Sequence, residues 1–303
     1  MTNRFVVYTV IVGGYDEVKQ PLVIDDRFDY VLFSDTHTEK RIGVWQIRTI
    51  DYKTNKNYLK ARYPRLNPEK VLQEYDAWLY HDGTMQIKSS KVYDRCIQYF
   101  MDDTEWVGIK HHCRSNVYEE MSAIILDKDK NMHDYDCVDW YWHMKREGYP
   151  NASQLNGNLI ETGFIFRIQT PNVKEVNSLW WESLEKYNVH RDQFSLPMAI
   201  WKVPTLRFAY FLGENEDLWN NPYVQYTKHI VKRGELVRCL GETIRYRCWR
   251  IAYKGELYTH LFDNAYKITR TNPHYALKIY TLYLMIRYGG LVIKEMTNSR
   301  VRK

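Results

Sequence analysis

The stretch Ala77–Ile87, AWLYHDGTMQI, runs from apolar residues straight into a histidine, a carboxylate and a glycine at 81–83. One interpretation is an ordinary Asp-Gly turn after a buried strand. The other is a site in which Asp82 holds a divalent cation against a diphosphate, because hard cations take carboxylate and phosphate oxygens as ligands. Gly83, which has no side chain, would let the ligand approach the backbone.

The elements that must position these residues follow from hydrophobic periodicity. Short apolar runs rich in β-branched residues predict strands, and longer amphipathic segments predict helices. The expected strands are 5–12, 29–36, 44–50, 75–83, 106–112, 159–170 and 206–213. The expected helices are 118–130, 136–148, 171–188 and 191–203. Residues 55–72 are interpreted as helix or loop, with Pro64 and Pro68 as breaks.

Strands that alternate with helices predict an α/β fold, with a mixed, mainly parallel sheet flanked by helices. Ligands of such sheets bind beyond the carboxyl ends of the strands. GGYD at 13–16, SDT at 34–36 and HDG at 81–83 all lie at the ends of expected strands. The sequence therefore predicts a ligand site at this edge of the sheet.

Composition limits the class of protein. The chain has 303 residues, of which 45% are hydrophobic, enough for one large domain with a sizeable core. The sequence contains no stretch of about 18 apolar residues, so no transmembrane helix is expected. The N-terminal apolar run is too short for a secretory signal. The five cysteines are scattered and form no CxxC pair. This pattern favours reduced thiols in a cytoplasmic protein and makes zinc unexpected.

Charge is distributed unevenly along the chain. Residues 228–303 carry 16 Lys and Arg against 5 Asp and Glu, whereas residues 1–227 carry 27 against 32. Helical periodicity replaces the strand pattern towards the C-terminus, so we expect one domain at 1–215 and a basic, mainly helical region at 216–303. Apolar residues at helical spacing beside arginines in 236–254 suit either a peripheral contact with the inner membrane surface or a solvated face of a packed helix.

Several short motifs occur in order along the first two thirds of the chain. They are YTVIVGGYD (8–16), DYVLFSD (29–35), WQIRTI (45–50), KARYPRLNPEKVLQEYDAWLYHDGTMQI (60–87), VGIKHHCRSNVYEE (107–120), EGYP (147–150), ETGFIFR (161–167) and LWWESLEKYNVHRDQFSLP (179–197). Together they resemble the glycosyltransferase-like family catalogued as domain of unknown function 616. The resemblance covers residues 5–210 and implies a GT-A-type nucleotide-sugar fold.

The resemblance implies transfer of a sugar from a nucleotide-diphosphate sugar to a glycan, lipid-linked or protein acceptor. Enzymes of this fold usually hold Mn²⁺ or Mg²⁺ on a D-x-D motif at a strand end, where the metal neutralises charge on the leaving diphosphate. Here position 80 is tyrosine and position 81 is histidine. Asp82 is therefore the one acidic residue of this motif expected to hold the metal.

The resemblance also implies a donor site at the ends of the first strands. Tyr15 could stack on the base, although an ordinary turn also explains its segment. Asp35 could hold the ribose or cap a helix. Arg62 or Arg65 could bind the diphosphate through paired hydrogen bonds or lie on a solvated face. The residues assigned to the donor nucleotide are Thr9, Val10, Tyr15, Asp35, Arg62, Arg65, His81 and Gly83.

The sugar and acceptor side is expected from HHCR at 111–114, ETG at 161–163 and Arg191. Adjacent residues of a strand point to opposite faces, so at most one of His111 and His112 should reach the site. A core histidine and a turn before a strand are the structural alternatives. The residues assigned to the sugar or acceptor are His111, His112, Arg114, Glu161, Thr162, Gly163 and Arg191.

Asp192 and Gln193, at the start of the expected helix 191–203, are the catalytic candidates. A helix start favours negative charge, so Asp192 could simply stabilise the helix. In the functional interpretation, Asp192 binds sugar hydroxyls or deprotonates the acceptor, as general-base catalysis with inversion requires.

Two other functions compete with this one. The missing D-x-D motif fits a non-catalytic GT-A-like protein that binds a glycan or a partner. The basic C-terminal region fits a nucleic-acid binder, but no nucleic-acid-binding module is recognisable, so no nucleic acid is expected.

Overall fold

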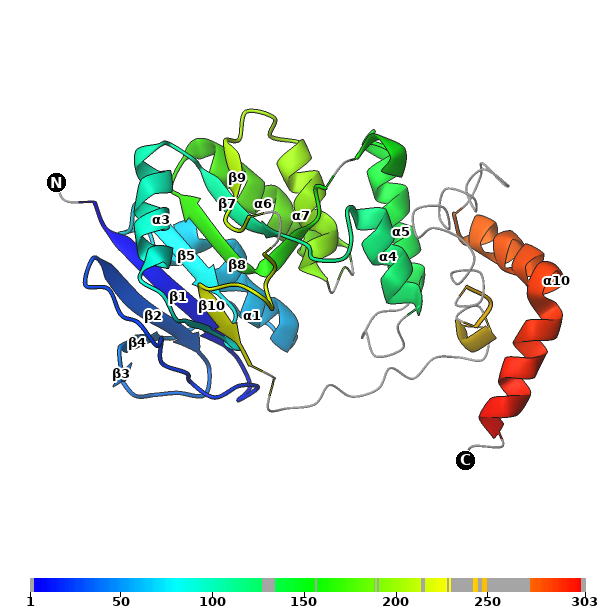
Figure 1. Cartoon of the computed structure of the whole chain (residues 1–303), viewed down its shortest axis with the longest axis horizontal. Helices are drawn as coiled ribbons and strands as arrows, with labels where there is room; N and C mark the ends of the chain where they lie inside the picture. Colours follow the sequence, from blue (N-terminus) through cyan, green and yellow to red (C-terminus); the bar gives the residue numbers. More distant parts are fainter. Residues whose placement is uncertain are drawn as a thin grey trace. The chain divides into compact units, whose positions relative to one another are not determined.

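The computed structural model describes residues 3–126, 134–155, 157–187, 189, 191–213, 216–227, 229, 242–244, 247–249 and 273–300. The chain divides into two compact units. The first consists of residues 1–113, 159–186 and 191–232, and the second of residues 114–158, 187–190 and 233–303. All strands of the described residues lie in the first unit (Figure 1).

The main sheet of the first unit has eight strands. They are β1 (Phe5–Ile11), β2 (Phe28–Ser34), β3 (Arg41–Ile42), β4 (Trp45–Arg48), β5 (Ala77–His81), β7 (Trp106–Lys110), β8 (Ile160–Ile168) and β9 (Phe208–Tyr210). Their order across the sheet is β3-β4-β2-β1-β5-β8-β7-β9. Strands β4, β2, β1 and β5 run parallel, as do β7 and β9, whereas β8 is antiparallel to both neighbours. The predicted mixed, mainly parallel sheet flanked by helices is confirmed.

The strand order reverses at β1. The chain passes from β1 to β2 and β4 on one side and then returns to β5 on the other. The register pairs Ile11 with Ser34 and Tyr8 with Tyr80, so the carboxyl ends of the three central strands lie together. In open α/β sheets, ligands bind outside the carboxyl ends at such a reversal. The segments 13–16, 34–36 and 81–83 all lie at this edge.

Each face of the sheet carries its own core, because side chains alternate along a strand. On one face, Phe5 and Val7 belong to a core completed by α3 (Lys91–Met101). On the other face, Val6 and Tyr8 belong to a core with side chains of four helices. These are α1 (Asn57–Leu66), α2 (Pro68–Val71), α6 (Pro171–Lys186) and α7 (Asp192–Trp201).

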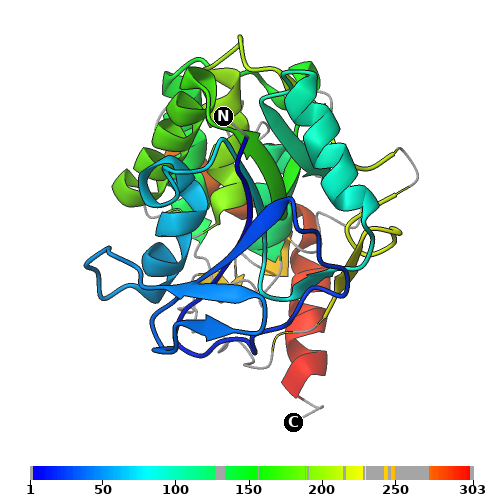
Figure 2. The same ribbon diagram turned by 90° about the vertical axis from the view of Figure 1, so that its left-hand side faces the viewer.

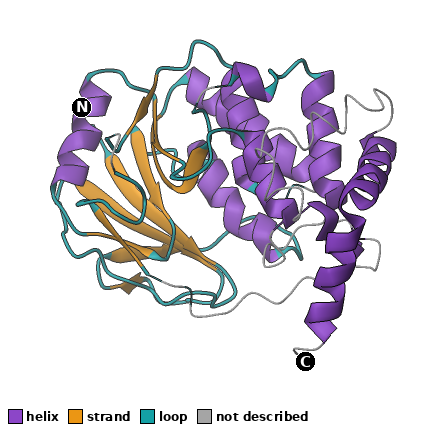
Figure 3. Cartoon of the chain, turned by 45° about the vertical axis from the view of Figure 1, so that its right-hand side comes forward, coloured by secondary structure: helices purple, strands orange, loops and turns teal. Residues whose placement is uncertain are grey.

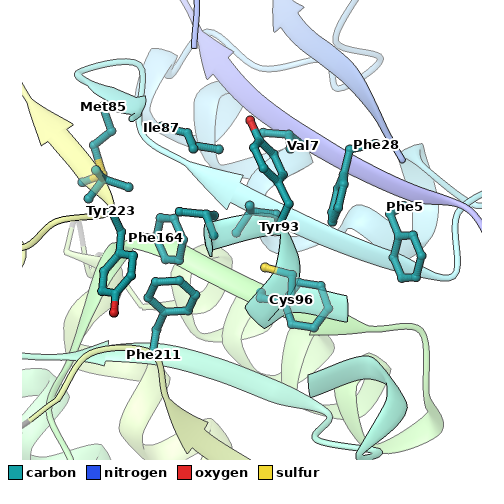
Figure 4. Close-up of a cluster of buried hydrophobic side chains, with 14 of the residues drawn as sticks. Phe5, Val7, Phe28, Met85, Ile87, Tyr93, Cys96, Phe164, Phe211 and Tyr223 are labelled. Carbon is teal, nitrogen blue, oxygen red and sulfur yellow. The ribbon is translucent and has the colours of Figure 1, made fainter. Parts of the chain in front are cut away.

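The figures show these layers within the first unit. In Figure 2, α3 (teal) and α1 (blue) lie on opposite sides of the strands. Figure 3 shows helices (purple) flanking the strands (orange). Figure 4 shows the core under α3, where Tyr93 and Cys96 lie among side chains from the strands, including Val7 and Phe164.

Several segments differ from the sequence predictions, and helix α3 and strand β3 were not expected at all. Pro64 does not break α1, whereas Pro68 begins α2, where a missing N–H needs no acceptor. No strand was expected after 213, yet β10 (Val224–Tyr226) pairs antiparallel with β6 (Met85–Ile87). That pairing partner is distant in sequence, so periodicity could not reveal it. The domain boundary at 215/216 stays a prediction, and the first compact unit extends to 232.

The second unit is helical in its described parts. It contains α4 (Val117–Leu126), α5 (Asp134–Arg146), a short 3₁₀ helix (Ala152–Gln154) and α10 (Pro273–Arg300), which contacts α5. Helix α10 agrees with the helix that the periodicity predicts near the C-terminus. Most of the basic segment 236–254 lies outside the described residues. No helix in the described part of the chain combines the length and hydropathy needed to cross a membrane.

Candidate active site

Asp82 follows β5 directly, at the edge where the strand order reverses. Its backbone N–H donates to the carbonyl of Gly163 at 2.9 Å. The Tyr80 hydroxyl donates to Oδ1 of Asp82 at 2.6 Å, which fixes the carboxylate. Burial and the neighbouring carboxylate of Asp82 raise the pKa of Tyr80, so this hydroxyl stays protonated. The Asp82 side chain remains 36% exposed, so one carboxylate at this edge is both oriented and open to a ligand.

Gly163 packs directly against this carboxylate. A Cβ on Gly163 would lie 2.9 Å from Oδ2 of Asp82 and 2.6 Å from the methyl group of Met85. The Met85 side chain can shift, but Asp82 is held by its neighbours. Glycine is therefore needed at 163 for close approach and not for a special backbone angle.

Replacing Gly163 with alanine is expected to lower the free energy of unfolding by about 1–3 kcal/mol through overpacking. Gly213 is the matched control, because a Cβ there would meet its nearest atom, Oε2 of Glu216, at an ordinary 3.7 Å. The Gly213→Ala variant should change stability by less than about 0.5 kcal/mol. Urea unfolding of both variants checks this, and equal stabilities would show that the contact with Asp82 is not tight.

Arg65 links two carboxylates from different parts of the chain. It lies in the last turn of α1 and is buried. Its Nη2 lies 2.8 Å from Oδ2 of Asp192, and its Nη1 lies 3.6 Å from Oδ1 of Asp82. It also donates to the carbonyl of Thr162, and its guanidinium lies 4.9 Å from the centre of the Tyr80 ring. Burial opposes the charge of Arg65, but the nearby carboxylates outweigh it and raise the pKa.

Asp192 is the first residue of α7 and is buried. Its Oδ1 lies 3.5 Å from Nη2 of Arg62, so two guanidinium groups of α1 face this carboxylate. Burial raises the pKa of Asp192, but Arg65, Arg62 and Arg191 together outweigh burial and hold it below its usual value. Asp192 is therefore ionised at neutral pH, and such a weak base is poorly matched to proton abstraction.

The lowered pKa of Asp192 makes its contribution to stability sensitive to acid. A carboxylate whose folded pKa lies below its unfolded value of about 3.9 stabilises the fold above that value. The contribution is lost as the pH falls through the folded pKa. The difference in unfolding free energy between wild type and Asp192→Asn should therefore be constant from pH 7 to about pH 5 and shrink below about pH 4.

Denaturant unfolding at a series of pH values measures this difference. Asp94 is the control, because its carboxylate is 59% exposed in its pair with Arg27. The Asp94→Asn variant should differ from wild type by less than about 1 kcal/mol at every pH. A gap for Asp192→Asn that stays unchanged down to pH 3 would contradict the assignment of an ionised carboxylate.

A buried polar network holds the backbone carbonyl of Arg65. Arg167 of β8 donates to the backbone carbonyl of Arg65 at 2.6 Å and to Oδ1 of Asn177 at 2.7 Å. The Tyr8 hydroxyl donates to the same carbonyl of Arg65 at 3.0 Å, and burial raises the pKa of Tyr8 to about 12. Asn177 in turn donates to Glu69 at 2.7 Å. These bonds fix the last turn of α1, and with it the position of the Arg65 side chain.

Glu161 joins the other two predicted segments. Its Oε2 accepts from Nε2 of Gln193 at 3.0 Å, and its Oε1 lies 2.9 Å from Nδ1 of His112. Arg191 donates to Oε1 of Gln193. The segments 111–112, 161–163 and 191–193 are therefore brought together in the first unit.

The expectation that His111 and His112 point to opposite faces is wrong. Strand β7 ends at Lys110, so the alternation of a strand no longer applies to the histidines. Their rings stack with centroids 4.8 Å apart and an interplanar angle of 10°. Nε2 of His111 also lies 3.6 Å from Oε1 of Glu161.

Asp35 and Gly13 connect the ends of β2 and β1. Oδ1 of Asp35 accepts from the backbone N–H of Gly13 at 2.8 Å, and Oδ2 lies 3.0 Å from Nζ of Lys60. Burial raises the pKa of Asp35, but the Gly13 N–H and Lys60 outweigh it and lower the pKa. Gly13 adopts a φ of 65°, which a glycine accommodates without strain. Asp35 therefore shapes the turn after β1.

Asp16 and His229 were not assigned to the site from the sequence. The Asp16 carboxylate lies 3.0 Å from Nδ1 of His229, whose ring is 4.8 Å from the Tyr15 ring. A Cβ on Gly83 would lie 3.6 Å from Oδ2 of Asp16. The carboxylate of Asp16 in GGYD thus lies close to the glycine of HDG. Asp16 and His229 are 213 positions apart, so periodicity gave no signal for their contact.

Three predicted residues of the first unit lie apart from the contacts around Asp82 and Asp192, and a fourth belongs to the second unit. His81 is buried against Trp45, with ring centroids 5.7 Å apart, and burial lowers its pKa. Thr9 is buried within the sheet, and Val10 packs on the core beneath α1 and α6. Arg114 belongs to the second unit, where it pairs with Glu120.

No protein-family model and no curated protein matches the sequence, so the resemblance to domain of unknown function 616 stays a prediction. Solved glycosyltransferase structures with a partial likeness to the chain include three. They are apo bifunctional WbbM (TM-score 0.39, 11% identity), apo mouse xyloside xylosyltransferase 1 (0.38, 7%) and an active-site mutant of LgtC (0.37, 9%). These matches cover 70%, 69% and 68% of this chain, and 39%, 85% and 72% of those chains. The chain thus spans less than half of WbbM.

Proposed function

We propose that the chain is a glycosyltransferase that moves a sugar from a nucleotide-diphosphate sugar to a glycan, lipid-linked or protein acceptor. One observation carries the proposal. At the edge where the strand order reverses, the open carboxylate of Asp82 and the buried carboxylate of Asp192 share the cation Arg65. Nucleotide ligands bind at this place in open α/β sheets, and the groups around it suit a diphosphate and a sugar.

Asp82 fits a hard divalent cation such as Mn²⁺ or Mg²⁺. Its oxygens are oriented by Tyr80, and its side chain is 36% exposed. Mg²⁺ is commonly held by one or two carboxylates together with substrate phosphates, so a single aspartate is sufficient. Asp16, which lies beside Gly83, and His229, which contacts Asp16, are the candidates for further ligands. When bound, the metal would neutralise charge on the diphosphate leaving group.

Arg65 and Arg62 provide positive charge beside Asp82 and Asp192. We assign Asp192 to stabilising this cationic pair and to binding sugar hydroxyls, because its lowered pKa makes it a weak base. Gln193 and Glu161 offer amide and carboxylate groups to the same side of the site. Preorganised charges of this kind stabilise the charge that develops in the transition state.

The proposal is tested by release of nucleoside diphosphate from UDP-, GDP- and dTDP-sugars in the presence of Mn²⁺, with glycan and glycolipid acceptors. We expect one donor to be consumed faster by the wild-type protein than by Asp82→Asn. Binding of glycans without consumption of any donor would favour a non-catalytic, glycan-binding function.

A further inference from the structure

His111, His112 and Cys113 form a cluster immediately after β7. Each offers one metal-ligating atom, and these atoms lie within 4.8 Å of one another. Nδ1 of His111 lies 3.9 Å from Sγ of Cys113. We propose that these three side chains bind a transition-metal ion of the Zn²⁺ class, at a site separate in its chemistry from the hard-ion site at Asp82.

The distances approach those of such an ion, and binding requires the exposed His112 ring to rotate out of its stack on His111. Zn²⁺ bonds of 2.0–2.1 Å to nitrogen and 2.3 Å to sulfur place neighbouring N and S ligands of a tetrahedron about 3.6 Å apart. The His111–Cys113 separation of 3.9 Å is close to this value. The widest separation, 4.8 Å, requires a contraction of about 1 Å. His111 is buried, whereas His112 and Cys113 are exposed, so two side chains can close on a fixed one.

Glu161 orients the imidazole of His112 and lies beside that of His111. Its Oε1 lies 2.9 Å from Nδ1 of His112 and 3.6 Å from Nε2 of His111. Metal-bound histidines usually donate their second ring N–H to a carboxylate in this way, which fixes the tautomer. With the proton of His111 on Nε2, its Nδ1 faces Cys113, where it accepts a long 3.2 Å hydrogen bond from the backbone N–H. A metal ion bound to Nδ1 of His111 would replace this hydrogen bond.

The ligand types decide which metal binds. A thiolate with two imidazoles selects Zn²⁺ and similar ions, whereas Mg²⁺ and Mn²⁺ prefer oxygen ligands. Three protein ligands leave a fourth position for water or an exogenous ligand, as in sites that are not purely structural. Gln193 holds the other oxygen of Glu161, so the cluster is tied to the start of α7. Zinc was unexpected from the sequence because the ligands do not form a CxxC motif.

Alkylation of Cys113 in the native protein tests the site. Cys113 is exposed, whereas Cys96, Cys137 and Cys248 are buried, so iodoacetamide should modify it first among these four. Zn²⁺ at ten times its dissociation constant should slow this modification about tenfold, because only the free protein reacts. Mg²⁺ should not slow it. Peptide mass spectrometry measures the rate at each cysteine.

Matched variants separate this proposal from the glycosyltransferase proposal. Protection by Zn²⁺ should disappear in His112→Gln and persist in His37→Gln, where the imidazole lies beside Glu39 away from the cluster. It should also persist in Asp82→Asn, whether or not that variant has lost donor binding. Unchanged alkylation with Zn²⁺, or protection that survives His112→Gln, would overturn the site.

Discussion

Replacing Arg65 with methionine is expected to lower the free energy of unfolding by about 3–5 kcal/mol, because removing one member of a buried ion pair leaves the other charge uncompensated. The charge that loses its nearest partner here is Asp192, which is buried at the start of α7 with its Oδ2 2.8 Å from Arg65 and keeps Arg62 at 3.5 Å. The carbonyl of Thr162 loses a donor at the same time. Urea unfolding at pH 7 measures the change.

The double variant Arg65→Met, Asp192→Asn is the decisive control. It also removes the charge that loses its nearest partner in Arg65→Met, so it should be more stable than the sum of the two single variants predicts, by about 1–3 kcal/mol. Arg62→Met removes a more distant partner, at 3.5 Å, and should be milder. A loss below about 1 kcal/mol for Arg65→Met would mean that the pair behaves like an exposed one.

Replacing Asp82 with asparagine is expected to reduce kcat/KM for donor consumption about 100-fold or more, which is the typical effect of removing one preorganised electrostatic group. Asparagine keeps the shape of the side chain but removes the charge that holds a divalent cation. Because Asp82 is 36% exposed, the fold should tolerate the change. Steady-state kinetics with Mn²⁺ and a melting curve of the same sample measure both effects.

Asp94→Asn provides the matched control for Asp82→Asn. Asp94 is an exposed carboxylate of α3, which covers the face of the sheet opposite to α1 and α7. Its variant should keep both activity and stability. Full activity of Asp82→Asn would remove Asp82 from the metal site. Loss of activity together with unfolding would show that Asp82 acts through the fold.

The sheet and the meeting of three polar segments at one of its edges could be predicted, because both depend on local patterns. The apolar runs that became β1, β2 and β5 end in polar residues, and parallel strands bring their ends together. The start of α7 was also visible as a polar triplet before an apolar segment. The strand ends predicted that Asp35 and Asp82 would lie near one edge, whereas Asp192 was a catalytic candidate from its place at a helix start.

The pairing of charges could not be predicted, because it depends on tertiary contacts. KARYPR has the composition of a solvated face, yet the structure buries Arg65 between two carboxylates. Arg167 gave the one available signal, a cation within the apolar strand FIFRI, and it supports Arg65 from behind. The stacking of His111 on His112 depends on where β7 ends, which periodicity locates only to within a few residues.

The most direct test of the central claim is calorimetric titration of the wild-type protein and Asp82→Asn with UDP, GDP and dTDP, each with and without Mn²⁺. We predict that one nucleoside diphosphate binds the wild-type protein only when Mn²⁺ is present and that Asp82→Asn binds it at least about tenfold more weakly, a difference of about 1.4 kcal/mol. Absence of binding by all three nucleotides, or equal metal-dependent binding by both proteins, would contradict a metal and diphosphate site at Asp82.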